Sequence, residues 1–189
     1  VVEDRSSEPT TRFLRANEGF DSFQSVWQQQ PGLLDVGFYY NDFLLPLAWS
    51  PATGPWNVLV LGLGAGTVLR VFSGEEGIDA RFTGVELDPE VIELGRQWMQ
   101  LNTDNENCRV WSGLDARVAL RIAEGQFEQI VLDCYANQVE IPPHLCTLEF
   151  FQELKECLSF GGWLTANLGG FDFDDPVIAA VARTCARAF

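Results

Sequence analysis

The chain is short of basic residues. Its 189 residues include 12 Lys and Arg against 27 Asp and Glu, which gives a formal net charge of −15. Nucleic-acid binding takes much of its affinity from Lys and Arg side chains that neutralise phosphates. We therefore expect no nucleic-acid partner. A negative field of this size would attract a cationic small molecule, although simple solubility is an equally good explanation.

Cysteine pairs and metal-ligand clusters are also missing. The five cysteines are an odd number without C-x-x-C spacing. This favours a reducing compartment, and hence a cytoplasmic location, over a disulfide framework. The single histidine, His144, has Cys146 nearby but no further ligand pair. We therefore expect no metal site, and a structural role for this ring.

Long apolar runs are absent as well. No run is long enough to cross a bilayer, and no basic-then-apolar signal opens the chain, so we expect no membrane association. Because the first residue is Val1, we expect the native chain to begin earlier.

Strands and helices alternate from Trp56 onward. Strands are expected over residues 57–61, 80–86, 108–111, 127–132 and 163–168, and helices over 67–73, from 88, over 115–123 and 147–158, and from 175. This alternation predicts an α/β fold with a doubly wound, mostly parallel, Rossmann-like sheet. Ligands of such sheets bind at the carboxyl ends of the strands, where we look for function.

The segment before this alternation is predicted to be a separate region, residues 1–54, in front of the α/β domain, residues 55–189. It contains a small β-hairpin around Phe20, Phe23, Val26 and Trp27, and a short helix over residues 39–48. A turn cluster over residues 50–55 separates the two parts.

Asp88 and Pro89 mark the start of the second helix of the α/β domain, because Asp is a good N-cap and Pro suits the first helical position. The apolar residues Val91, Leu94, Trp98 and Leu101 recur at helical spacing and give this helix an apolar face.

A glycine turn follows the first predicted strand of the α/β domain. Residues 58–61 are an unbroken apolar run, and Gly62, Gly64 and Gly66 then give G-x-G-x-G. The dinucleotide motif G-x-G-x-x-G would place its third glycine at Thr67. The spacing found here is typical of S-adenosylmethionine (AdoMet) enzymes. A tight turn that binds nothing is the alternative.

Three acidic residues end the next strands. Glu86 lies twenty residues after Gly66 and suits the ribose hydroxyls. Asp115 could receive the adenine amino group, or cap a helix, or do both. Asp133 would face the reacting end of the cofactor and fix an amine or take its proton, unless it is an ordinary turn residue.

Several segments resemble the spermidine synthase family, in particular its divergent spermidine-synthase-like members. FQSV and YND, at residues 23–26 and 40–42, resemble its Tyr-Gln-x-Ile and Tyr-His/Gln-Glu segments. GLGAGTVLR, GVELDPEVIELGRQ, GLDA and DCYANQVEIPPHLCTLEFF resemble its glycine loop, second strand and helix, adenine segment and Ile-Pro-x-His-Leu-x-Thr-x-Glu stretch. The last match is the most specific of these.

The resemblance implies a fold of the class I AdoMet methyltransferase type and a transferase activity. Its cofactor would be AdoMet or decarboxylated AdoMet, without a metal, and its partner a small, amine-type acceptor. Gln24 would touch the cofactor, and Tyr39, Tyr40 and Asp42 would line the acceptor side. A homodimer is left open.

Two departures from the family pattern concern the acceptor. Ala65 and Ala136 stand where true spermidine synthases have aspartates that help to hold the diamine and the aminopropyl ammonium. An unpaired buried ammonium is costly, so putrescine is disfavoured as acceptor. The alternative function is a nucleoside-binding module that has lost turnover. The fold's usual terminal antiparallel strands do not follow, so we expect a truncated or disordered end after Phe189.

Overall fold

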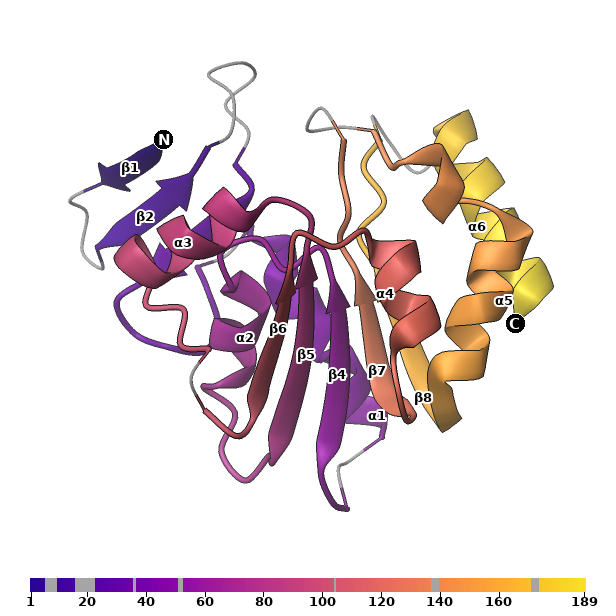
Figure 1. Cartoon of the computed structure of the whole chain (residues 1–189), viewed down its shortest axis with the longest axis horizontal. Coiled ribbons are helices and arrows are strands. Elements are labelled where there is room, and N and C mark those ends of the chain that lie inside the picture. Colours follow the sequence, from indigo (N-terminus) through magenta and orange to yellow (C-terminus); the bar gives the residue numbers. More distant parts are fainter. Residues whose placement is uncertain are drawn as a thin grey trace.

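A five-stranded parallel sheet forms the centre of the molecule in the computed structural model, which describes residues 1–5, 10–15, 23–35, 37–50, 53–103, 105–136, 140–170 and 174–189. The strand order is β6-β5-β4-β7-β8, and all neighbouring pairs are parallel (Figure 1). The strands are β4 (Trp56–Leu61), β5 (Ala80–Glu86), β6 (Cys108–Ser112), β7 (Phe127–Leu132) and β8 (Leu158–Ala166). The predicted doubly wound α/β fold is confirmed.

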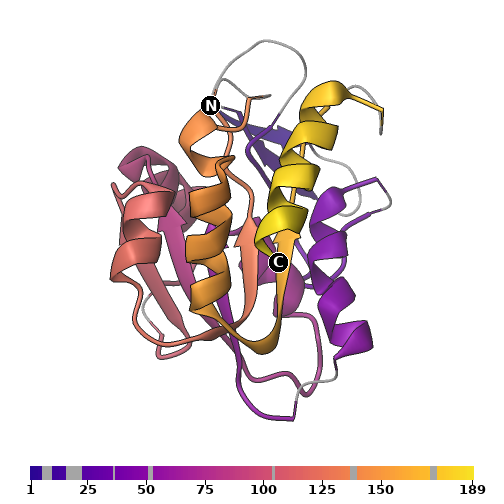
Figure 2. The same ribbon diagram turned by 90° about the vertical axis from the view of Figure 1, so that its right-hand side faces the viewer.

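Helices cover both faces of this sheet. The 3-10 helix η1 (Tyr39–Leu44) and the helices α1 (Leu45–Trp49), α2 (Thr67–Phe72) and α3 (Pro89–Trp98) belong to one face. The helices α4 (Ala116–Ile122), α5 (Leu148–Cys157) and α6 (Pro176–Ala188) belong to the other. Figure 2 shows α4 and α5 on one side of the sheet and η1 with α1 on the other.

The central strand β4 is buried on both sides. Val58 and Val60 pack into the core under α2, whereas Leu59 and Leu61 pack into the core under α4 and α5. All four side chains are 0% exposed. This explains why the sequence shows an unbroken apolar run here instead of alternation.

The N-terminal region is a three-stranded antiparallel sheet, one strand more than the predicted hairpin. Its strands are β1 (Val2–Arg5), β2 (Thr11–Leu14) and β3 (Ser25–Gln28). β3 contains the predicted Val26 and Trp27, whereas β1 and β2 lie in the polar start of the chain, where no strand was predicted. Phe20 lies outside the described residues.

Hydrogen bonds attach β3 to the glycine turn that follows β4. The hydroxyl of Thr67 donates to the carbonyl of Val26 (2.9 Å) and accepts from its amide (3.0 Å), and the Ala65 amide donates to Ser25 Oγ (2.7 Å). The Thr67 hydroxyl therefore pairs with both backbone groups of Val26 at the edge of β3, as the backbone of a neighbouring strand would. The N-terminal sheet and the glycine turn form one unit.

Two predicted elements have different bounds in the structure. The helix predicted over residues 39–48 is divided into η1 and α1, with Pro46 in the first turn of α1. The last strand begins at Leu158 rather than at Trp163, and passes Gly161 and Gly162 through a register shift against β7. A bulge absorbs these glycines, so they do not end the strand.

Within the part of the chain that the structure describes, no helix is long and apolar enough to cross a membrane. The five cysteines, all in described positions, are free.

We expect Thr67→Val to weaken the attachment of the N-terminal sheet. The substitution leaves the buried amide and carbonyl of Val26 without their side-chain partner, and unsatisfied buried groups cost roughly 1–3 kcal/mol each. Thermal unfolding should show a loss of about 2 kcal/mol or more. Thr184→Val, which removes an exposed hydroxyl bonded to Ala180 within α6, is the matched control and should change stability by no more than about 0.5 kcal/mol. Equal losses in both variants would contradict the attachment.

Candidate active site at the carboxyl ends of the strands

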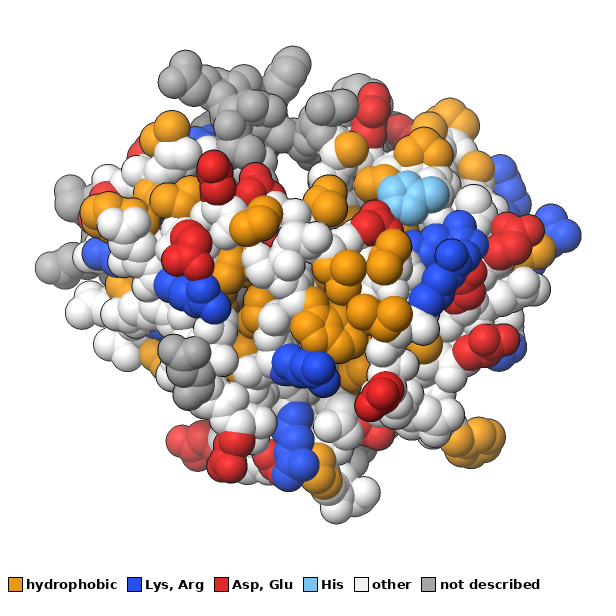
Figure 3. Space-filling view, in the orientation of Figure 1, with side chains coloured by type: hydrophobic (Ala, Val, Ile, Leu, Met, Phe, Trp, Pro, Cys, Tyr) orange, Lys and Arg blue, Asp and Glu red, His pale blue; other side chains and the backbone are white. Residues whose placement is uncertain are grey.

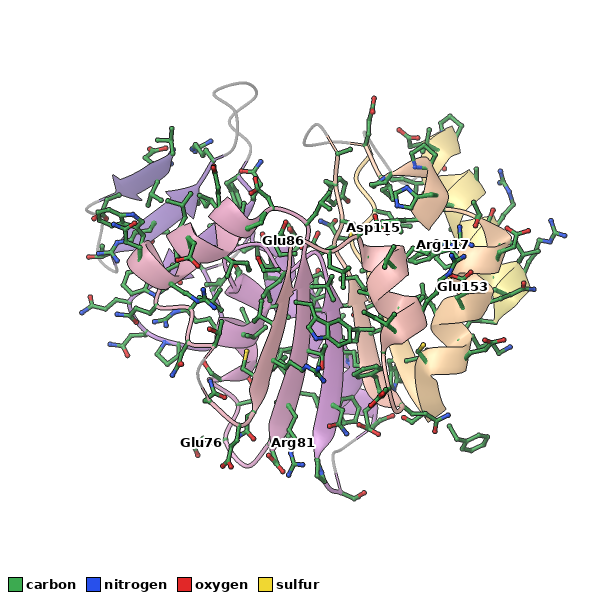
Figure 4. All side chains as sticks on the ribbon, in the orientation of Figure 1. Glu76, Arg81, Glu86, Asp115, Arg117 and Glu153 are labelled. Atoms are coloured by element: carbon green, nitrogen blue, oxygen red, sulfur yellow. The ribbon has the colours of Figure 1, made fainter. Side chains whose placement is uncertain are left out.

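One cavity of about 190 Å³ lies at the carboxyl ends of the central strands. It brings together eight of the ten site residues predicted from the sequence: Gln24, Tyr39, Tyr40, Gly62, Gly64, Glu86, Asp115 and Asp133. Figure 4 shows Glu86 at the end of β5 and Asp115 at the start of α4, at the edge of the sheet opposite to Glu76 and Arg81. The cavity thus lies where the fold class predicts a ligand.

The glycine turn forms one wall. Gly62, Gly64 and Gly66 have φ values of 86°, 56° and 91°, in the left-handed region that favours glycine. A side chain at Gly62 would overlap the backbone carbonyl of Asp133, and one at Gly64 would overlap Ser25 Oγ. The turn therefore needs glycine for close packing as well as for its conformation.

Gly66, predicted to bind the cofactor, does not line this cavity. It precedes α2 as the N-cap residue and lines a separate depression with Leu101 and Arg70. Its Cβ would meet the side chain of Leu101. The third glycine is therefore explained by its positive φ and by its close contact with Leu101 rather than by contact with the cavity.

Glu86 is held by the backbone. Its two carboxylate oxygens accept from the amides of Gly64 (2.8 Å) and Asp88 (3.0 Å). Burial raises the pKa of Glu86, and the hydrogen bonds from Asp88, Gly64 and Leu87 oppose this rise only in part. These amides do not use all the lone pairs of the carboxylate, so it can still accept a hydroxyl group in the cavity.

Asp133 lies between two donors. Tyr39 donates its hydroxyl to Oδ2, and Asn167 donates its side-chain amide to Oδ1, both at 2.9 Å. Burial raises the pKa of Asp133 to about 6, against the effect of these two hydrogen bonds, and the charge of Glu86 raises it further. A carboxylate with such a pKa can accept a proton near neutral pH.

Asn167 was not among the predicted site residues. It directly follows β8, and its amide donates to the carbonyl of Leu132 at the end of β7. It was missed because the strand predicted over residues 163–168 included it, whereas β8 ends at Ala166 and is mostly only partly buried.

Two stacked tyrosines close another side of the cavity. The ring centroids of Tyr39 and Tyr40 lie 4.2 Å apart, and the Tyr40 hydroxyl donates to the backbone carbonyl of Gln24 (3.1 Å). Burial raises the pKa of both tyrosines, so they remain protonated donors. η1 thereby connects the N-terminal region to Asp133.

Asp42, predicted on the acceptor side, is exposed and does not line the cavity. Tyr40 and Phe43 occupy the buried face of η1, whereas Asp42 is exposed although it lies three residues after Tyr39.

Asp115 caps α4, as one of its two interpretations predicted. Oδ1 accepts from the amides of Arg117 (2.9 Å) and Val118 (3.2 Å), and Oδ2 contacts Nε2 of His144 (2.9 Å). Burial raises the pKa of Asp115, but the hydrogen bonds from His144 and the two amides outweigh it and lower the pKa overall. The carboxylate also lines the cavity.

Ion pairs support α4 from outside. Arg117 makes two hydrogen bonds to Glu153 of α5 (2.9 and 3.0 Å) and one to the backbone carbonyl of His144 (3.2 Å). Figure 4 shows Arg117 and Glu153 between the two helices.

Across the residues that the structure describes, no group of three or more His, Cys, Asp or Glu side chains could hold a metal ion.

Together, the parallel sheet, the glycine turn and the acidic residues at successive strand ends define a class I methyltransferase-like α/β domain. Residues 37–189 match the family model of the spermine/spermidine synthase domain. The chain belongs to that family.

Individual relatives agree with this assignment. A polyamine aminopropyltransferase of Vibrio vulnificus is 37% identical over 132 residues, which are 68% of this chain and 42% of that protein. A probable polyamine aminopropyl transferase of Bifidobacterium longum is 27% identical over 167 residues, 88% of this chain and 35% of that protein. The chain thus spans less than half the length of these two curated relatives.

Among solved structures, spermidine synthase from Thermotoga maritima has a TM-score of 0.67 at 19% identity, over 100% of this chain and 64% of that one. Human methyltransferase-like protein 13, in complex with SAH, has a TM-score of 0.65 at 20% identity, over 77% of this chain and 70% of that one. At these identities the two structures show the shared fold.

We expect Gly62→Ala to be far more damaging than Gly77→Ala. Both glycines have a positive φ, but only the new methyl group at Gly62 would overlap the Asp133 carbonyl, whereas Gly77 has open space around it. The conformational cost of about 1 kcal/mol is common to both. The overlap should add about 1–3 kcal/mol at Gly62, measured by thermal or denaturant unfolding. Equal losses would show that the backbone contact is not tight.

Proposed function

We propose that the protein transfers an aminopropyl group from decarboxylated AdoMet to a small amine. The observation that carries this proposal is Asp133, a largely buried carboxylate fixed by Tyr39 and Asn167 in the same cavity as Glu86. The names of the curated relatives, polyamine aminopropyltransferases, support the same reaction.

The nucleoside half of the cofactor would occupy the β5 side of the cavity. Glu86 would accept from the ribose hydroxyls where its backbone partners leave the carboxylate free. Asp115 would accept the adenine amino group. Gln24 would contact the cofactor from the N-terminal region, next to Tyr40.

Charge favours decarboxylated AdoMet over AdoMet. Among the described residues that line the cavity there is no Lys or Arg, whereas three are carboxylates, Glu86, Asp115 and Asp133. The carboxylate of AdoMet would enter without a cationic partner and beside negative charges, which is costly in a low-dielectric site. The ammonium and sulfonium of the decarboxylated form suit the same surroundings.

In the reaction, the lone pair of the acceptor amine attacks the aminopropyl carbon bonded to the sulfonium. The new C–N bond forms as the C–S bond breaks. The electron pair of the C–S bond stays on sulfur and removes its positive charge, which gives the thioether of methylthioadenosine. Asp133 takes the proton that the amine loses. Because the sulfonium carbon is already activated, most of the remaining catalysis is positioning of the amine, for which the Tyr39–Asp133 contact provides a fixed point.

The test is calorimetric binding followed by a product assay. We expect decarboxylated AdoMet and methylthioadenosine to bind, and AdoMet to bind at least about tenfold more weakly because of its unpaired carboxylate. Turnover is then measured with a panel of mono-, di- and triamines. Tighter binding of AdoMet would contradict the choice of cofactor. Binding of the nucleosides without turnover of any amine would instead favour the binding-module alternative.

We expect the reaction rate to fall at acid pH because Asp133 becomes protonated. This fall is the acid limb of the pH–rate profile. The pKa of Asp133 is raised to about 6, so the base form is lost as the pH falls through that value, and the rate should drop about tenfold per pH unit below it. Asp133→Asn should lower the rate by a factor of roughly 10²–10⁴ and remove this limb. Ionisation of the amine substrate affects both proteins alike, so the comparison isolates Asp133. An unchanged acid limb in the variant would exclude Asp133 as the base.

A further inference from the structure

His144 occupies an unusual position at the rim of the cavity. It lies in the short 3-10 helix η2 (Pro143–Leu145), and its Nε2 is 2.9 Å from Oδ2 of Asp115. An ionised carboxylate can only accept, so Nε2 carries the proton and donates. Figure 3 shows the histidine ring, in pale blue, on the surface beside an acidic side chain. Its side chain is 48% exposed, so the ring is not needed to fill a core.

The contact completes the fixation of the Asp115 carboxylate. Oδ1 accepts from the amides of Arg117 and Val118, and Oδ2 accepts from His144. The two amides hold one oxygen, and His144 holds the other, so rotation of the carboxylate about the Cβ–Cγ bond would break hydrogen bonds at both oxygens. The third donor therefore restrains the plane more strongly and leaves one lone pair of Oδ2 unused.

We propose that His144 is a positioning residue, which aims the free lone pair of Asp115 at the exocyclic amino group of a purine base. The proposal rests on the proposed nucleoside site and extends it, because it assigns to His144 the preference for a 6-amino purine. A site built around a fixed acceptor rejects a ligand that lacks the matching donor, since the acceptor then remains unpaired.

A second contact separates this role from a purely structural one. The backbone carbonyl of His144 accepts from Arg117, which is itself held by two hydrogen bonds to Glu153. Loss of the imidazole therefore leaves η2 attached to α4 through the backbone. Pro142 and Leu145, which line the cavity, keep this attachment in a variant without the ring.

The experiment compares two ligands on three proteins. The ligands are 5′-methylthioadenosine and its analogue without the 6-amino group, and the proteins are the unchanged chain, His144→Ala and His144→Gln. For His144→Ala we expect about threefold to tenfold weaker binding of methylthioadenosine, the range for one hydrogen bond, and less than about twofold change for the analogue. His144→Gln, whose side-chain amide can donate from a similar distance, should restore most of the difference.

Each outcome decides the matter. Equal weakening for both ligands would show that His144 only supports the loop, and would overturn the proposal. Unchanged binding of methylthioadenosine to His144→Ala would overturn it as well. If the unchanged protein binds neither ligand, the proposed nucleoside site itself fails. Thermal unfolding of the variants shows whether they remain folded, and a half-exposed position should tolerate both substitutions.

Discussion

The close approach of Gly62 to the backbone of Asp133 is the contact on which the rest of the site depends. The amide of Asp133 donates to the carbonyl of Leu61, and the amides of Gly62 and Leu63 donate to the carbonyl of Val85. One turn thus ties together the ends of β4, β5 and β7. A side chain at Gly62 would occupy the place of the Asp133 carbonyl. Any other residue here would push away the backbone of Asp133, whose carboxylate shares the cavity with Glu86.

This arrangement has an electrostatic cost. Burial raises the pKa of both Glu86 and Asp133, and each is affected by other negative charge nearby. For Asp133 the folded pKa of about 6 exceeds the ordinary unfolded value. The native state therefore binds more protons than the unfolded state between these two values, and its stability falls as the pH rises through that interval. A cationic ligand would relieve the repulsion. The carboxylates thus make the cavity complementary to positive charge at a cost in stability, a common property of functional sites.

Local signals in the sequence predicted much of the fold, and contacts between distant residues limited the rest. The capping residues Asp88, Asp115, Thr147 and Asp175 all precede helices, and each accepts from a backbone amide in the first turn. The apolar face of α3 was predicted correctly only in part. Val91 and Leu94 pack against the cluster that contains Ala65, and Leu101 is buried. Trp98, however, is 44% exposed, and Ile92 and Gly95 are the residues buried within the helix. Both stripes have helical spacing and differ by one position, so only the packing against the glycine turn, where Ala65 meets Gly95, decides between them. Asn167 and His144 are separated from their carboxylate partners by 34 and 29 residues, so no local pattern indicates these contacts.

Ala65 shows how the structure changes the meaning of a sequence departure. In the sequence it reads as a lost carboxylate toward the acceptor. In the structure its side chain is buried in an apolar cluster with Leu14, Trp27 and Met99, under the N-terminal sheet, and it does not line the cavity. A charge at this position would be buried among apolar side chains, which is unfavourable without a partner. The alanine therefore belongs to the packing of β2 and β3 on the glycine turn, the same packing that places Gln24 beside Tyr40.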